Sequence, residues 1–141
     1  MTEQKSCDRL INAFARLSQD GIDCALWLVG DGGDKDKLQS LAKEKGLTNV
    51  VFLGKQLNPY KYMKNADLYV CSSLYEGYNL TVAEALILGV PTLSTNCTGP
   101  CEILDNGKYG VIVDNSEDGL FSGIKDLLTN ADKLIYYRQK R

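Results

Sequence analysis

Two glutamates, Glu76 and Glu84, are the residues of this chain best suited to chemistry, and they lie on either side of a glycine turn at Gly77. An apolar run at 68–71 precedes the turn and an apolar, helix-like segment at 84–88 follows it. Free backbone N–H groups and the positive end of the helix dipole make such a helix start an anion site. Because the carboxylates flank that site, the pattern suits a phosphorylated, hydroxyl-rich ligand.

The same residues also allow a purely structural interpretation. Thr81 and Glu84 match a capping box, in which Thr81 bonds a first-turn N–H and Glu84 reaches back to the cap. Gly77 would then only permit the turn, and Glu76 would be a solvated loop acid. On the motif alone, a ligand site and a helix cap are equally good interpretations.

The elements that must position these residues alternate between strands and helices. Strands are predicted at 25–29, 50–53, 68–72, 91–95 and 110–113. Helices are predicted at 5–19, 37–45, 58–65, 81–88, 117–129 and 131–139, with a short turn near 100–105. This alternation predicts an α/β fold, a parallel sheet with helices on both faces.

The predicted sheet places the motif where such folds bind ligands. Ligands of open parallel sheets gather at the carboxyl ends of the strands. Gly30-Asp31-Gly32, Gly54-Lys55 and the segment 72–81 all follow predicted strands. The run 25–29 is continuously apolar, which predicts a strand buried on both faces.

The amino-terminal end departs from a doubly wound fold. Such folds begin with a strand that lies in the middle of the sheet, whereas residues 1–5 are too few and too polar to form it. We therefore expect residues 1–141 to be a single domain that lacks its first strand and comes from a longer protein.

Composition excludes several classes of protein. The net charge of −2 provides no basic field to attract nucleic acid. No apolar run approaches the length of a membrane span and no secretory signal opens the chain. The five cysteines are an odd number without the spacing of a secreted scaffold, which indicates a reducing, cytoplasmic location.

The cysteines and acids do not suggest a metal centre. The chain has no histidine, and Gly99-Pro100 between Cys97 and Cys101 argues against a helix that would bring these two thiols together. We expect no metal and no other cofactor.

The order of several motifs resembles the nucleotide-sugar-binding, C-terminal domain of group 1 (family four) retaining glycosyltransferases, which have the GT-B fold. The resemblance covers roughly residues 5–130. The segments that carry it, besides 76–84, are Val29-Gly30-Asp31-Gly32, Val51-Phe52-Leu53-Gly54, Ala66-Asp67-Leu68-Tyr69-Val70, 89–95 and 99–104.

The resemblance implies a role for each candidate residue. Glu76 would be the catalytic residue, in contact with hydroxyls of the transferred sugar near its anomeric centre, and Glu84 would accept hydrogen bonds from the ribose. Lys5 would pair with the diphosphate, and Gly54 and Lys55 would lie beside the nucleobase. The backbone amides that would hold the diphosphate are those around Gly77, Tyr78, Asn79, Leu80 and Thr81.

The resemblance also implies a reaction. A sugar would pass from a nucleoside diphosphate, a UDP-sugar by expectation, to an acceptor with retention of configuration. Amide donors and a cation stabilise the leaving diphosphate, so no metal is required. The acceptor would be a glycan or lipid, as in polysaccharide assembly, and weak association of the parent protein with a membrane surface would fit such an acceptor.

Two parts of the family's active site are missing from this sequence. The family has an arginine shortly before the position of Lys5, and many members have a catalytic histidine in an N-terminal acceptor domain. Neither is present here. We therefore expect this chain to supply the donor site alone and to be inactive in isolation.

Two other functions remain open at this stage. In a dinucleotide-binding oxidoreductase, Gly30 and Gly32 would need a third glycine at position 35, where Lys35 stands. In a non-catalytic α/β interaction module, the two glutamates would only cap and solvate.

Overall fold

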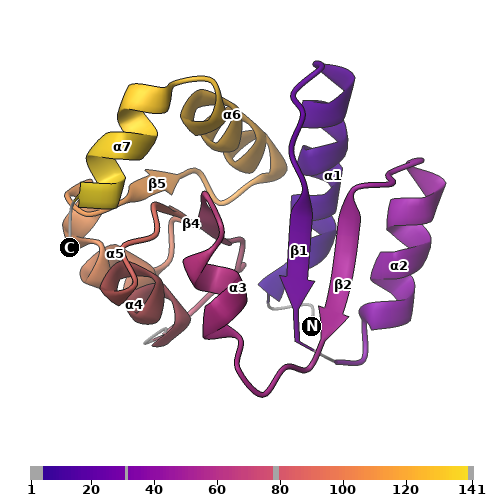
Figure 1. Ribbon diagram of the computed structural model, residues 1–141, viewed down its shortest axis with the longest axis horizontal. Helices are drawn as coiled ribbons and strands as arrows, with labels where there is room; N and C mark the ends of the chain where they lie inside the picture. The colour runs from indigo at the N-terminus through magenta and orange to yellow at the C-terminus, as the bar shows by residue number, and fades with distance from the viewer. Residues whose placement is uncertain (1–4, 31, 78–79, 140–141) are drawn as a thin grey trace.

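The computed structural model describes residues 5–30, 32–77 and 80–139, which form an α/β structure (Figure 1). None of the helices in these ranges is long and apolar enough to cross a membrane. In chain order the elements are α1 (Cys7–Gln19), β1 (Leu26–Val29), α2 (Lys35–Glu44), β2 (Val50–Gly54), α3 (Tyr60–Lys64), β3 (Tyr69–Cys71), α4 (Leu80–Ile87), β4 (Thr92–Thr95), α5 (Thr98–Ile103), a 3₁₀ turn (Asp105–Gly107), β5 (Val111–Val113), α6 (Glu117–Leu128) and α7 (Ala131–Gln139).

The strands form two parallel sheets instead of the single sheet predicted. Strand β1 pairs with β2, and β4 pairs with β3 on one side and β5 on the other. Within the described residues no backbone ladder joins β1 to β3. The interruption between these two strands lies where a doubly wound sheet has its first strand, as the sequence predicted.

Helices cover both faces of the three-stranded sheet, as predicted. Side chains of alternate strand residues point to opposite faces. Leu93 and Val113 belong to the core formed with α1 and α6, whereas Cys71 and Ile112 pack with Val82 of α4. The α/β class and the two helical layers are therefore confirmed.

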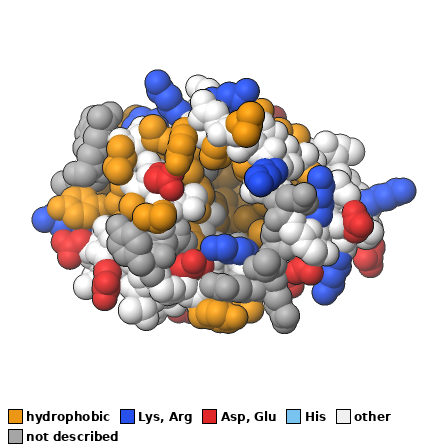
Figure 2. All heavy atoms as spheres, turned by 90° about the horizontal axis from the view of Figure 1, so that it is seen from below, with side chains coloured by type: hydrophobic (Ala, Val, Ile, Leu, Met, Phe, Trp, Pro, Cys, Tyr) orange, Lys and Arg blue, Asp and Glu red, His pale blue; other side chains and the backbone are white. Residues whose placement is uncertain are grey.

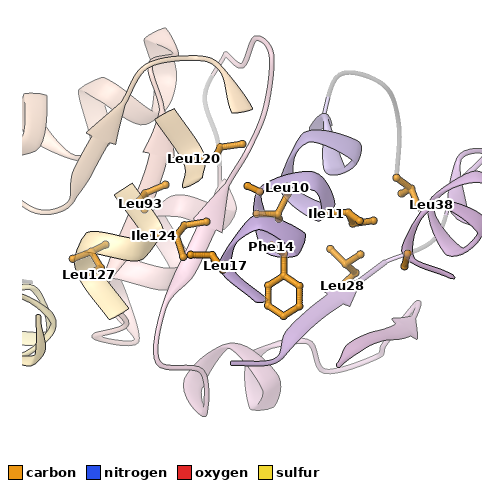
Figure 3. Close-up of a cluster of buried hydrophobic side chains, with 12 residues drawn as sticks. Leu10, Ile11, Phe14, Leu17, Leu28, Leu38, Leu93, Leu120, Ile124 and Leu127 are labelled. Atoms are coloured by element: carbon orange, nitrogen blue, oxygen red, sulfur yellow. The ribbon is translucent and has the colours of Figure 1, made fainter. Parts of the chain in front are cut away.

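Helix α1 fills the space between the two sheets. Figure 3 shows its apolar side chains between those of β1 and α2 on one side and those of β4 and α6 on the other. Ile11 and Leu17 of α1 are completely buried, as is Leu120 of α6. One continuous apolar core therefore joins the two sheets although no strand does.

The prediction that 25–29 is buried on both faces is wrong. Leu28 is buried against α1, but Trp27 and Val29 on the opposite face are 44% and 37% exposed. Trp27 makes an edge-to-face contact with Tyr62 of α3, with ring centroids 6.1 Å apart. This single short helix leaves much of that face of β1 in solvent.

The segment predicted as a turn near 100–105 contains a short helix, α5. Pro100 lies in its first turn, where the missing N–H costs nothing because that group would be unpaired anyway. The Cys101 N–H donates to the carbonyl of Cys97 at 2.9 Å, so Gly99-Pro100 does not prevent a helical turn here. All five cysteines are free thiols.

Candidate functional site

Lys5 and Glu76, far apart in the sequence, form an ion pair. The Lys5 Nζ lies 3.1 Å from Oε1 and 3.2 Å from Oε2 of Glu76. The Glu76 side chain is only 10% exposed, whereas that of Lys5 is 48% exposed. Because a buried carboxylate without a partner is unstable, the ammonium group is what allows Glu76 to lie so deep.

The backbone around this pair is held by three further contacts. The Ser72 hydroxyl donates to the Lys5 carbonyl at 2.8 Å, which ties the amino-terminal segment to the loop after β3. The Gly99 N–H at the start of α5 donates to the Glu76 carbonyl at 3.4 Å. Three segments distant in sequence therefore meet at the carboxyl end of β3, where the sequence predicted a site.

The glycine turn and the start of α4 follow directly. Gly77 is exposed, and the first residue of α4, Leu80, is 64% exposed. The first amides of a helix lack intrahelical partners, so this accessible helix start provides the donors predicted for an anion. Tyr78 and Asn79 lie outside the described residues.

The structure gives Thr81 and Glu84 side-chain partners on other elements. Thr81 lies inside α4, one residue after its start, so the prediction that it is the N-cap residue is wrong. Burial raises the pKa of Tyr69, whose hydroxyl is hydrogen-bonded to Thr81. A hydrogen bond with Glu84 raises the pKa of the Tyr60 phenol in α3.

Gly54 lies at the joint carboxyl end of β1 and β2. Its φ of 68° suits glycine, and its carbonyl accepts from the Gly30 N–H at 2.8 Å. A Cβ at position 54 would lie 3.8 Å from Lys35 Nζ, so an ammonium group is close to this strand end. Lys55 is exposed. Within the described residues, no hydrogen bond or ion pair links Gly54 or Lys55 to Lys5 and Glu76.

The molecule is hollowed on the side toward which β1 and β2 point. Figure 2 looks onto this side and shows a depression with a hydrophobic interior. Charged side chains of both signs lie on its rim. A ligand with an apolar part and an anionic part would find both kinds of surface there.

Sequence reasoning missed four residues near these groups. Tyr60 contacts Glu84, and Lys35 lies beside Gly54. Arg9 and Asn115 bond to the loop that carries Glu76. Arg9 lies in α1 and Asn115 follows β5, and neither belongs to a recognisable motif, so only the fold brings them to the site.

The family profile of the group 1 glycosyl transferases matches residues 1–141. A Methanocaldococcus jannaschii protein described as uncharacterized glycosyltransferase MJ1059 is 46% identical over 127 residues, which are 79% of this chain and 31% of that protein. N-acetylgalactosamine-N,N'-diacetylbacillosaminyl-diphospho-undecaprenol 4-alpha-N-acetylgalactosaminyltransferase of Campylobacter jejuni is 34% identical over 128 residues, 89% of this chain and 34% of the relative. The chain thus spans about a third of the length of these relatives.

Solved structures agree with this match. S. aureus TarM, in a complex with Fondaparinux, alpha-GlcNAc-glycerol and UDP, superposes with a TM-score of 0.92 at 26% identity, over 99% of this chain and 29% of TarM. WaaG, a glycosyltransferase involved in lipopolysaccharide biosynthesis, has the same fold, with a TM-score of 0.87 over 97% of this chain and 38% of WaaG at 24% identity. The family predicted from the order of the motifs is confirmed: this chain belongs to the group 1 glycosyl transferases, and its fold is that of GT-B enzymes.

Proposed function

We propose that this chain is the donor-binding part of a retaining glycosyltransferase that uses a UDP-sugar. The observation that carries the proposal is the ion pair between Lys5 and Glu76 beside the exposed start of α4. It sets a cation, a carboxylate and helix-start amides within one site, and these are the groups that a sugar diphosphate needs. The complex of the related TarM with UDP supports the choice of nucleotide.

The chemistry follows from where charge develops. As the bond between sugar and diphosphate breaks, negative charge accumulates on the leaving phosphate oxygens. The Lys5 ammonium and the amides from Gly77 to Thr81, aimed at that charge, would stabilise it without a metal ion. Glu76, released from Lys5 by the phosphates, would accept hydrogen bonds from the hydroxyls of the transferred sugar. Gly54 and Lys55 would contact the nucleobase.

Glu84 has the second role, that of recognising the ribose. Its carboxylate already accepts a hydrogen bond from the Tyr60 hydroxyl, so it is oriented away from its own helix toward α3. A carboxylate fixed in this way has further lone pairs for the two ribose hydroxyls.

A calorimetric titration tests this assignment. The chain should bind UDP more tightly than 2′,3′-dideoxy-UDP, by about tenfold, because the dideoxy ligand leaves Glu84 without its partners. Glu84→Gln should abolish that preference, while Glu102→Gln, an exposed glutamate of α5, should keep it. Equal affinity of the unaltered chain for both nucleotides would contradict the role of Glu84, and tighter binding of NADH than of UDP would favour a dinucleotide site.

The acceptor, a glycan or lipid, would bind to a part of the parent protein outside this chain. We therefore propose that the chain alone binds the donor and transfers no sugar. Measurable transfer from a UDP-sugar to an added acceptor by this chain would refute that. In the parent protein, NMR of the product should show the anomeric configuration of the donor, and inversion would exclude the retaining mechanism.

A further inference from the structure

The guanidinium group of Arg9 contacts the residues next to both members of the Lys5–Glu76 pair. On the Glu76 side, Nη2 donates to the Ser72 carbonyl at 2.9 Å and to the Ser73 carbonyl at 3.4 Å. On the Lys5 side, Nε donates to the Ser6 hydroxyl at 2.6 Å. The planar fork of an arginine can hold two such groups at a fixed separation, which a lysine cannot do.

Ser6, the residue next to Lys5, needs this support. It is buried and adopts a left-handed backbone conformation, with φ 53° and ψ 41°. A residue with a Cβ is strained in this region, by an amount of order 1 kcal/mol, unless its surroundings hold it. The bond from Arg9 fixes the Ser6 side chain, and this conformation sets the direction in which Lys5 leaves α1.

Asn115 extends the contact along the loop. Its Oδ1 accepts from Arg9 Nη2 at 2.7 Å, and its Nδ2 donates to the Leu74 carbonyl at 2.6 Å. The carbonyls of three successive residues, Ser72 to Leu74, are therefore bound by Arg9 and Asn115. Glu76 is two residues beyond the last of them, so these bonds fix the path of the backbone into Glu76.

We propose that Arg9, with Asn115, is the positioning residue of the donor site: its guanidinium group sets the separation of Lys5 and Glu76. The proposal rests on the donor-binding function above. Arg9 itself does not touch the donor. Its replacement would let the amino-terminal segment and the loop after β3 move independently, and a displacement of about 1 Å in such a site lowers its effectiveness by up to about a hundredfold.

The test compares Arg9→Lys with Arg16→Lys in the same helix. Arg16 is a matched control because it also bonds across the fold, to Glu117 and Asp118, but on the side of α6. Arg9→Lys should raise the dissociation constant of UDP about tenfold, and Arg16→Lys should leave it unchanged. Both variants should melt at similar temperatures, so that lost affinity does not reflect unfolding.

A measurement without nucleotide separates this proposal from the proposed function. In ligand-free spectra, Arg9→Lys should shift the amide signals of Lys5, Glu76 and Gly99, and Arg16→Lys should not. If the unaltered chain fails to bind UDP while these shifts occur, the donor function is wrong and the positioning role stands. If Arg9→Lys binds UDP normally and leaves the three signals in place, the positioning role is wrong.

A second variant covers the outcome in which Arg9→Lys does not fold. Asn115→Ala leaves Arg9 bonded to Ser6 and Ser72 but frees the Leu74 carbonyl. It should shift the Glu76 amide signal and weaken UDP binding about threefold, within the range for one neutral hydrogen bond. A folded Asn115→Ala variant with unchanged signals and affinity would equally overturn the proposal.

Discussion

Lys5 and Glu76 neutralise one another in the absence of ligand. This arrangement lets a nearly buried carboxylate persist beside a site for a polyanion, because the ammonium group cancels its repulsion. When a diphosphate binds, the ammonium group has a stronger partner and the carboxylate becomes available to sugar hydroxyls. One residue pair can thus serve both the empty and the occupied site.

Lys5→Met should therefore weaken UDP binding by about tenfold or more, the effect of losing a charge-assisted hydrogen bond. Lys43→Met, an exposed lysine in the last turn of α2, is the control and should bind UDP like the unaltered chain. Calorimetry at constant ionic strength measures both. Equal losses for the two variants would mean that only overall charge matters.

Metal removal should have no effect on the donor site. The groups assigned to the diphosphate are an ammonium group and backbone amides, and within the described residues no cluster of three or more metal-ligating side chains is present. The dissociation constant of UDP should be the same with EDTA as with Mg²⁺. A large gain in affinity with Mg²⁺ would show that the ion contributes to binding.

Tyr69 gives a pH dependence at the residue scale. Burial raises its pKa above the ordinary value of 10.0, so its phenol stays neutral in the folded protein where the unfolded chain ionises. Stability from this group is complete below pH 10 and is lost as the pH rises above it, by about 1.4 kcal/mol per pH unit. Urea unfolding between pH 8 and 11 should show a shallower decline for Tyr69→Phe than for Tyr75→Phe, whose residue is 66% exposed. Parallel declines would contradict this assignment.

At the scale of elements, periodicity predicted the positions of helices and strands well. Apolar runs ended by glycine, such as 50–53 before Gly54, became strands, and the amphipathic segment 5–19 became α1. The failures have local causes. Pro100 is accommodated in the first turn of a helix, and the outer face of β1 is covered only in part by Tyr62 of α3.

The close packing of α6 on β4 and β5 gives a prediction at this scale. A Cβ at Gly123 would lie 2.5 Å from Val113 Cγ1 and 2.8 Å from Leu93 Cδ1. Gly123→Ala should therefore destabilise the protein by about 1–3 kcal/mol through overpacking, despite the better helix propensity of alanine. Gly33→Ala, with no neighbour within 4 Å of its Cβ, is the control. A Gly123→Ala variant as stable as the control would show that α6 is loosely packed.

At the scale of the molecule, an apolar core holds together two sheets that share no ladder. Figure 3 shows Leu17 of α1 next to Ile124 of α6, and Phe14 next to Leu28 of β1. The sequence predicted the interruption of the sheet, since the strand order of doubly wound folds is general. It did not predict that Arg9 and Asn115 join the halves at the site, because hydrogen bonds between distant segments leave no periodic signal.

The shared core predicts that both sheets unfold together. Leu17→Ala should cost about 2–5 kcal/mol, and the midpoints reported by Trp27 fluorescence, for the β1 side, and by the Leu93 amide signal, for the β4 side, should fall equally. If the Leu93 midpoint falls and the Trp27 midpoint does not, the two sheets are independent units.

The most direct test of the account is a titration of the ¹⁵N-labelled chain with UDP, followed by amide NMR. Donor binding at the carboxyl end of β3 predicts saturable shifts at Lys5, Glu76, Gly77 and Leu80–Glu84. Residues 18–23, at the opposite end of α1, should keep their signals. If saturating UDP leaves the signals of Lys5 and Glu76–Glu84 unchanged, the donor site assigned to this chain is wrong.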